Sequence, residues 1–494
     1  MSEHTLPALI PIIFLGFGIL IPLVGLRIRS AVYPLALLGS GAATVVAFTG
    51  LFTVLDSGPM VHQMGGWAPP IGIVLILDHL SAFVVSIVTV IGFLVLIYAR
   101  HSILDDTPQR YTVIYGLSML LMAGLTGMVL TGDMFNLYVW LEISSLSAYA
   151  LIAAGDRRGA VAAFRYLILG SLGGGFYLLG VGFLYFATGT LNMADMAGLL
   201  PALQDSRVVL AGAAMIILGL GLKMALFPLH LWLPDAYAFA PQAVSSLIAP
   251  IMTKVAAYAM IRMVLDVFGV SYLRDSVPAL TVVGWLGAVG ILVGSLWAMT
   301  QKDYRRMLAF SSVSQVGYIA VGIGMGTTLG MVGALLHILN HATMKACLFL
   351  VGGSVRLKTR ALEVAEFGGL GRRMKWTMVA FTLGAMSMIG VPPTAGFFSK
   401  WYLVRGGLQA GNWIFIAVIL ISSLLTAIYF FRLVEQVYRD ESQQEDAKPP
   451  VGEAPASMFV PTVVLALLLV ALGFGNAVIV THVLEPVASV VGGM

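Results

Sequence analysis

Residues 221–241 read GLKMALFPLHLWLPDAYAFAP, an apolar run that holds one lysine, Lys223, and three prolines. Proline lacks a backbone N–H donor and clashes with the preceding helical turn, so we expect the helix to unwind around Pro228, Pro234 and Pro241. Unwound backbone at membrane depth is tolerated only where it is buried in protein or lines a wet cavity. The run therefore predicts a discontinuous membrane helix with a lysine at its break.

A second run, residues 390–400, reads GVPPTAGFFSK and again places a lysine, Lys400, beside prolines, here Pro392 and Pro393. Discontinuous helices at corresponding positions of two halves are typical of transporters built from inverted repeats. If the expected membrane spans are numbered along the chain, spans four to eight form one set of five and spans nine to thirteen form another. Adjacent repeats with an odd number of spans have opposite orientations, so we expect two inverted five-helix repeats.

The composition is that of a membrane protein. Of the 494 residues, 59% are hydrophobic and 10% are charged, which leaves too little polar surface to cover a soluble globule. Apolar runs of roughly 20 residues, the length that spans a bilayer, occur about fourteen times. They lie near residues 7–26, 31–54, 72–98, 112–130, 134–154, 160–187, 208–232, 241–265, 277–299, 308–325, 329–352, 376–397, 412–435 and 458–482. We therefore predict an all-α integral membrane protein of about fourteen transmembrane helices, the first being a span and not a signal peptide.

These runs divide the chain into four predicted parts. Residues 1–110 hold the first three helices, 111–270 the first repeat, 271–440 the inverted second repeat, and 441–494 a loop and the last helix. The single Cys347 excludes an intrachain disulfide and a cysteine-based zinc or iron–sulfur site within this chain.

Basic residues are concentrated in alternate loops. Lys and Arg are sparse after even-numbered spans, where Arg207, Arg274 and Arg405 are isolated, and crowded after odd-numbered ones. The crowded loops hold Arg27, Arg29, Arg100, Arg110, Arg157, Arg158, Lys302, Arg305, Arg306, Arg356, Lys358, Arg360, Arg372, Arg373 and Lys375. Because cytoplasmic loops carry the excess of Lys and Arg, we expect both termini outside the cytoplasm.

Several titratable residues fall inside hydrophobic stretches of the sequence. They are Glu142, Lys223, Lys254, His337, His341, Lys345 and Lys400. A charge at the centre of a membrane helix costs roughly 2.5–3.5 kcal/mol on insertion scales, so such groups indicate an ion or proton path by default.

The residues His337, His341 and Lys345 recur at every fourth position and so line one helical face. Two histidines at this spacing could bind a metal ion, but an HExxH pattern and a neighbouring carboxylate are both missing, so we predict no metal site. A proton relay fits better, because neutral imidazole both donates and accepts a hydrogen bond. Helix–helix hydrogen bonding is the alternative.

Four motifs resemble the antiporter-like subunits shared by respiratory complex I, membrane-bound hydrogenases and Mrp-type Na⁺/H⁺ antiporters. They are residues 130–142 (LTGDMFNLYVWLE), 223–235 (KMALFPLHLWLPD), 337–345 (HILNHATMK) and 396–400 (GFFSK). The motifs are long and specific, and the resemblance runs from about the third span to the thirteenth.

Within that family the motifs point in two directions. Residues 65–75 (GGWAPPIGIVL) and 188–195 (TGTLNMAD) look most like the D subunit of Mrp antiporters. Residues 234–242 (PDAYAFAPQ) look more like the complex I and hydrogenase members. The parent complex is therefore left open between these classes.

The resemblance implies that Glu142 pairs with Lys223 as a switch. We expect Lys254 to be the connecting proton carrier and Lys400 the terminal relay or exit. The alternatives are a structural carboxylate for Glu142, a lysine held by carbonyls of the broken helix for Lys254, and an interfacial anchor beside Trp401 for Lys400.

Other residues near the breaks have weaker functional signals. His230 and Asp235 flank the first break and are either accessory relays or partners of freed backbone groups. Asp78 and Asp133 look like span-edge residues without a role. The glycines at 170–175 are typical of close helix packing.

The predicted function is a proton-translocating subunit of a multi-subunit Na⁺/H⁺ antiporter, a transporter and not itself an enzyme, in a bacterial or archaeal cytoplasmic membrane. Protons would move along a mid-membrane row of Glu142, Lys223, Lys254, His341 or His337, and Lys400. The expected partners are H⁺, Na⁺, the lipid bilayer and other hydrophobic subunits, one of them a homologous antiporter-like subunit.

Two alternatives remain. The chain could be a proton-pumping membrane arm of a complex I-like NADH:quinone oxidoreductase or of a hydrogenase. Flavin, iron–sulfur and quinone motifs are not recognisable, so we expect no cofactor here and a redox role would rest on partners. Alternatively it is a structural membrane scaffold. The charge pattern gives no reason to expect nucleic-acid binding.

Overall fold

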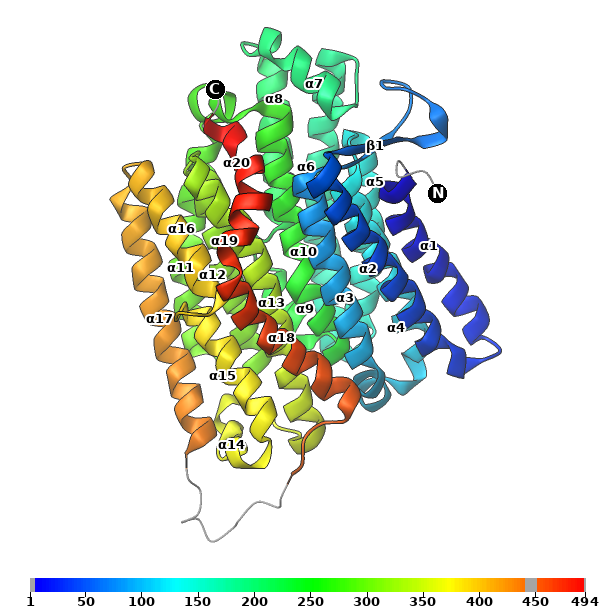
Figure 1. The fold of residues 1–494 in the computed structure, drawn as a ribbon, viewed down its shortest axis with the longest axis vertical. Coiled ribbons are helices and arrows are strands. Elements are labelled where there is room, and N and C mark those ends of the chain that lie inside the picture. Colours follow the sequence, from blue (N-terminus) through cyan, green and yellow to red (C-terminus); the bar gives the residue numbers. More distant parts are fainter. Residues whose placement is uncertain (1–4, 440–450, 493–494) are drawn as a thin grey trace.

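The computed structural model describes residues 5–439 and 451–492, and in these residues the protein is a bundle of long, roughly aligned helices (Figure 1). The bundle is formed by α1 (Leu6–Gly25), α2 (Val32–Ser57), α3 (His79–Asp106), α4 (Tyr111–Leu130), α5 (Met134–Ala153), α6 (Arg157–Thr188), α7 (Met193–Leu199), α8 (Arg207–Lys223), α9 (Leu233–Phe239), α10 (Gln242–Arg262), α11 (Ala279–Thr300), α12 (Tyr304–Gly324), α13 (Thr328–Thr359), α14 (Leu370–Arg373), α15 (Lys375–Ile389), α16 (Ala395–Gln409), α17 (Trp413–Tyr438), α18 (Ala456–Phe474), α19 (Asn476–Ile479) and α20 (Glu485–Gly492). The predicted loop at the start of residues 441–494 falls largely outside the described residues.

Within the described residues, twelve helical segments are long and apolar enough to cross a membrane. They coincide in order with twelve of the predicted spans. The other two predicted spans, near 208–232 and 376–397, are interrupted, since α8 ends at Lys223 and α15 ends at Ile389. The helical membrane architecture is thus confirmed, while the number of fourteen spans and the inverted repeat stay predictions.

One predicted boundary was wrong. Residues 72–78 were expected to open a membrane helix, but Val74–Leu77 form strand β2, which pairs antiparallel with β1 (Met60–Gln63). The helix begins later because Asp78 caps it, accepting a hydrogen bond from the Ser81 backbone at 2.8 Å. A short run rich in Val, Leu and Ile suits a strand as well as a helix, and periodicity does not separate the two.

Three helices form the buried centre of the bundle. All residues of α10 are buried, and so are most residues of α12 and α13. Outer helices such as α1, α2, α6 and α17 leave large apolar side chains exposed, as expected where a helix faces lipid. Lys254, His337, His341 and Lys345 therefore lie in the interior of the protein.

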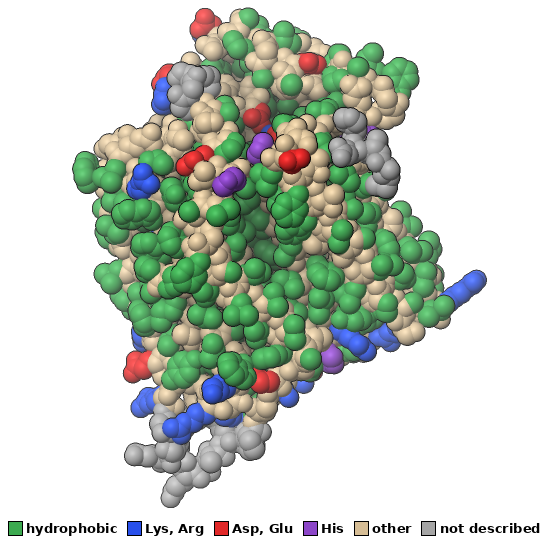
Figure 2. Space-filling view, viewed as in Figure 1, with side chains coloured by type: hydrophobic (Ala, Val, Ile, Leu, Met, Phe, Trp, Pro, Cys, Tyr) green, Lys and Arg blue, Asp and Glu red, His purple; other side chains and the backbone are tan. Residues whose placement is uncertain are grey.

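The two ends of the bundle differ in charge. On the face shown in Figure 2, Lys and Arg side chains gather along the lower end, near α14. The start of α1 and the end of α20 both lie toward the opposite, upper end, on different sides of the bundle (Figure 1). This arrangement has the asymmetry that the loop composition predicts.

Candidate functional site

The end of α8 brings a lysine and a carboxylate together. The Lys223 Nζ lies 3.8 Å from Glu142 Oε1 on α5 and donates a hydrogen bond to Ser145 Oγ at 2.7 Å. The Lys223 side chain is 5% exposed and that of Glu142 is 25% exposed. Glu142 and Ser145 come from adjacent turns of α5, so one helix face supplies both partners.

Gly174 on α6 makes room for the Glu142 carboxylate. A Cβ atom at this position would lie 2.3 Å from Glu142 Oε1, whereas one at Gly175 would meet no atom within 4 Å. Gly173 faces the other way, toward the backbone of Gly219 on α8. The glycine cluster, predicted to allow close helix packing, therefore also leaves the space that the Glu142 carboxylate occupies beside Lys223.

The helix break predicted after Lys223 is present in the structure. The helix α8 ends at Lys223. Trp232 Nε1 donates a hydrogen bond to the Leu222 carbonyl at 3.0 Å, which satisfies one of the carbonyls that the helix end leaves without a helical partner. Pro228 lies in the non-helical stretch, Pro234 in the first turn of α9, and Pro241 at the N-cap of α10. A cation at the C-terminal end of a helix is favoured by the helix dipole, which suits Lys223.

Lys254 lies in the middle of α10 and is 1% exposed. Its Nζ donates to the Ala249 carbonyl at 2.7 Å and to Thr253 Oγ1 at 3.3 Å. These contacts match the alternative in which carbonyls hold this lysine. Among the interactions of the described residues, none joins the side chains of Lys254 and Lys223 directly.

The predicted helical face on α13 points into the protein interior. His337 Nδ1 and Ser399 Oγ are 2.9 Å apart, and the His337 and His341 rings lie 5.8 Å apart. In the described part of the chain, neither ring nitrogen of His341 has a hydrogen-bond partner. Lys345 Nζ donates to Ser311 Oγ at 2.5 Å and to a carbonyl of α12.

Lys400 on α16 lies at the second break. Its Nζ donates to the Met388 and Ile389 carbonyls at 3.0 and 2.9 Å and to Ser423 Oγ at 3.1 Å. It is 6% exposed and lies over the Tyr318 ring. Within this chain the side chain is therefore buried at the carbonyl end of α15, rather than extended to an interface. Pro392 and Pro393 lie in the non-helical stretch between α15 and α16.

Charges connect these groups across three helices. Lys254 interacts electrostatically with His337 and His341, Lys345 with His341, and Lys400 with His337. The structure thus brings together the predicted residues of α10, α13 and α16, while Glu142 and Lys223 form a separate pair on α5 and α8.

The two accessory residues lie apart from this row. His230 is 1% exposed, stacks on Phe227, and has no hydrogen-bond partner within the described residues. Asp235 forms ion pairs with Arg165 at 2.9 Å and Arg306 at 3.6 Å. Its side chain links α6, α9 and α12 instead of binding freed backbone groups.

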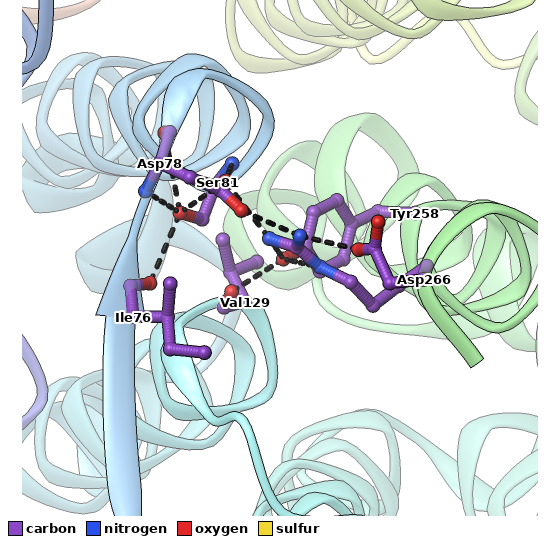
Figure 3. Close-up of polar contacts among 7 residues, drawn as sticks. Ile76, Asp78, Ser81, Val129, Tyr258 and Asp266 are labelled. Carbon is purple, nitrogen blue, oxygen red and sulfur yellow. Dashed lines mark hydrogen bonds and ion pairs between the residues drawn. The ribbon is translucent and has the colours of Figure 1, made fainter. Parts of the chain in front are cut away.

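A buried cluster around Arg262, at the end of α10, was missed by the sequence analysis. Its guanidinium donates to both Asp78 oxygens, at 2.6 and 2.9 Å, to Asp266 at 2.5 Å and to Tyr258 (Figure 3). Burial raises the pKa of Asp78, but the charge and hydrogen bonds of Arg262 outweigh burial and hold the pKa at about 2. The repeat of Lys254, Tyr258, Arg262 and Asp266 at every fourth residue was the available signal.

No group of three or more His, Cys, Asp and Glu side chains in the described residues is arranged to hold a metal ion.

Comparisons with known proteins agree with this architecture. Residues 131–426 match the family model described as NADH:quinone oxidoreductase/Mrp antiporter, TM. The chain is 49% identical to NADH-quinone oxidoreductase subunit N of Desulforudis audaxviator, with 91% of each chain covered. It is 32% identical to the D subunit of the Na(+)/H(+) antiporter of Alkalihalophilus pseudofirmus, covering 87% of this chain and 86% of the relative.

A solved structure extends the likeness to the whole fold. A chain in the structure of the Mrp complex from Dietzia sp. superposes with a TM-score of 0.88 at 26% identity. The match covers 100% of this chain and 97% of that one.

Proposed function

Because this chain belongs to the NADH:quinone oxidoreductase/Mrp antiporter transmembrane family, we propose that it is a proton-translocating subunit of the membrane arm of a larger complex. One observation carries the proposal. A buried lysine lies 3.8 Å from a membrane-depth carboxylate, at the end of an interrupted helix. Burying two charges at this depth is costly, and a scaffold has no use for them.

Protons move along the row Glu142, Lys223, Lys254, His341 or His337, and Lys400. Coulomb attraction holds a proton on Lys223 while Glu142 is close, and separating the two groups releases it to the next acceptor. The electrostatic contacts among Lys254, the two histidines and Lys400 support the second part of the row. Lys345, bonded to Ser311, supplies protons to His341 from the side.

The topology that we propose is the one expected from the sequence. Both termini lie on the extracytoplasmic side, and residues 111–270 and 271–440 are the two inverted repeats. Support comes from the basic end of the bundle, which lies opposite the start of α1 and the end of α20.

Two parent complexes are supported by different relatives. The 49% identity to an NADH-quinone oxidoreductase subunit N favours a redox-driven arm, for which this chain is the proton-moving part. The 32% identity to the D subunit of an antiporter, and the fold of the Mrp complex, favour a cation/proton antiporter exchanging Na⁺. We place the redox-driven arm first because its relative is more similar to this chain.

The parent complex can be identified by isolating it through this chain from native membranes. Flavin or iron–sulfur absorption bands with large hydrophilic subunits would establish the redox-driven arm. A colourless assembly of small hydrophobic subunits would contradict that assignment and establish the antiporter.

The proton role itself is tested by Lys223→Ala in the complete complex. We expect proton transport in vesicles to be lost, while Lys302→Ala, which removes an exposed loop lysine, transports normally. Retention of transport by Lys223→Ala in a correctly assembled complex would contradict the proposal.

A further inference from the structure

A cavity opens at the end of the bundle that carries the basic loops. It has a volume of about 280 Å³ and lies between the ends of α11 and α17 and the start of α12. Its lining includes Gln301, Tyr429, Glu435 and two arginines, Arg432 and Arg439. A polar cavity of this size is large enough to hold several water molecules.

Tyr429 lies on the inner side of this cavity. It is 5% exposed, and its hydroxyl has no hydrogen-bond partner in the described residues. The side chains of Thr426 and Ser311 lie beside this hydroxyl. A buried hydroxyl without a partner is uncommon in proteins, and here it borders a polar cavity on one side and Ser311 on the other.

Ser311 connects the cavity to the row of titratable groups. It is fully buried on α12, and its Oγ accepts a hydrogen bond from Lys345 Nζ at 2.5 Å. Lys345 in turn interacts electrostatically with His341 and Lys254. Among the described residues, Glu435 is the one carboxylate that lines the cavity. A path from the surface to the interior thus runs through Glu435, Tyr429, Ser311 and Lys345.

We infer that this cavity is a port through which protons exchange between the aqueous phase and the row, with Glu435 as the group that binds them first. This inference rests on the proposed proton-translocating function. A proton leaves the Glu435 carboxyl group and ends on the Lys345 amine. The Tyr429 and Ser311 hydroxyls each accept one proton and release one, so both are unchanged after the transfer.

The charges of the cavity allow a rival occupant. Arg432 and Arg439 are exposed and could bind the phosphate of an anionic lipid headgroup, as basic pockets between membrane helices do. Two observations favour the proton port. Glu435 lies between the two arginines on the same face of α17, where it repels a phosphate, and the unpartnered Tyr429 hydroxyl leads inward to Ser311.

The test measures proton transport by the complete complex in inside-out vesicles at low buffer concentration. A carboxylate at the mouth of a cleft raises the capture rate of a cation by about tenfold or more, so Glu435→Gln should slow transport about tenfold. Adding a membrane-impermeant buffer that delivers protons to the cavity should restore the rate. Glu435→Asp should keep most of the activity.

Two further variants complete the test. Tyr429→Phe removes the inner hydroxyl and should slow transport in a way that added buffer does not restore. Glu485→Gln changes an exposed carboxylate outside the cavity and should transport normally. Subunit content and thermal stability of each complex establish that it is assembled.

A wild-type rate in Glu435→Gln at low buffer concentration would overturn the port. The port would also be overturned if Glu435→Gln lost transport activity that added buffer did not restore and that varied with the anionic lipid content of the vesicles. This result would assign the cavity to a lipid headgroup. Lys223→Ala in the same vesicles separates the two proposals. If it abolishes transport while Glu435→Gln has no effect, the proton-translocating function stands and the port does not.

Discussion

One methyl group on α6 should weaken the Lys223–Glu142 pair without unfolding the protein. A Cβ at position 174 would lie 2.3 Å from Glu142 Oε1, and ordinary contact begins at 3.4 Å, so the carboxylate must retreat by 1.1 Å. The Glu142 side chain is 25% exposed and that of Lys223 is 5% exposed, so the free space lies away from the amine. Gly174→Ala should therefore lengthen the 3.8 Å separation, to at most about 4.9 Å.

The cost of this displacement follows from Coulomb's law. With an effective dielectric constant of about 20, the full lengthening weakens the attraction by about 1 kcal/mol, which is about fivefold in an equilibrium and is the upper limit of the effect. Alanine is favoured over glycine in a helix by up to about 1 kcal/mol, so the fold itself should not lose stability. Function and stability are thus expected to change in opposite directions.

The assay compares proton transport and thermal unfolding of the complete complex. Gly174→Ala should slow transport by up to about fivefold, following the weakened pair, with an unchanged or higher melting temperature. Gly175→Ala is the matched control, because its new methyl group meets no atom within 4 Å, and it should leave transport unchanged. Wild-type transport by Gly174→Ala, or an equal loss in both variants, would refute this reasoning.

Three further predictions concern charges outside that pair. Arg262→Ala leaves Asp78 and Asp266 without their shared partner. It should destabilise the protein by about 3–5 kcal/mol in thermal unfolding. A loss of stability below about 1 kcal/mol would show that the cluster is dispensable. The pKa of Asp78 is lowered from 3.8 to about 2, so this carboxylate contributes about 2 kcal/mol above pH 4 that is lost as the pH falls toward 2. Asp78→Asn should flatten that acid dependence of the melting temperature, and an unaltered slope would contradict the assignment. Lys400→Met should abolish proton transport while the complex still assembles, and transport by an assembled variant would make Lys400 a structural residue.

Much of the architecture could be predicted because its signals are local. Apolar runs of bilayer length, and a lysine beside prolines in two of them, were enough to place α8 and α15 and the interruptions after them. The same local reading failed at residues 72–78, where a short apolar run formed β2 instead of helix.

Contacts between distant parts of the chain were out of reach of the sequence. Arg262 binds Asp78, 184 residues away, and neither residue alone differs from an ordinary charge at the edge of a span. Gly174 resembled its neighbouring glycines until the structure placed Glu142 beside it. The link from Tyr429 to Ser311 depends likewise on how α17 packs against α12.

Lys254 is the residue on which a continuous row depends, because it lies on the central helix α10 and interacts with both histidines of α13. The most direct measurement is proton transport by the purified complex with Lys254→Met, reconstituted in vesicles and supplied with its own driving force. A row that runs from Glu142 to Lys400 predicts that transport is lost while subunit content and melting temperature stay near those of the wild type. Transport at the wild-type rate by the assembled variant would contradict a proton path through this residue.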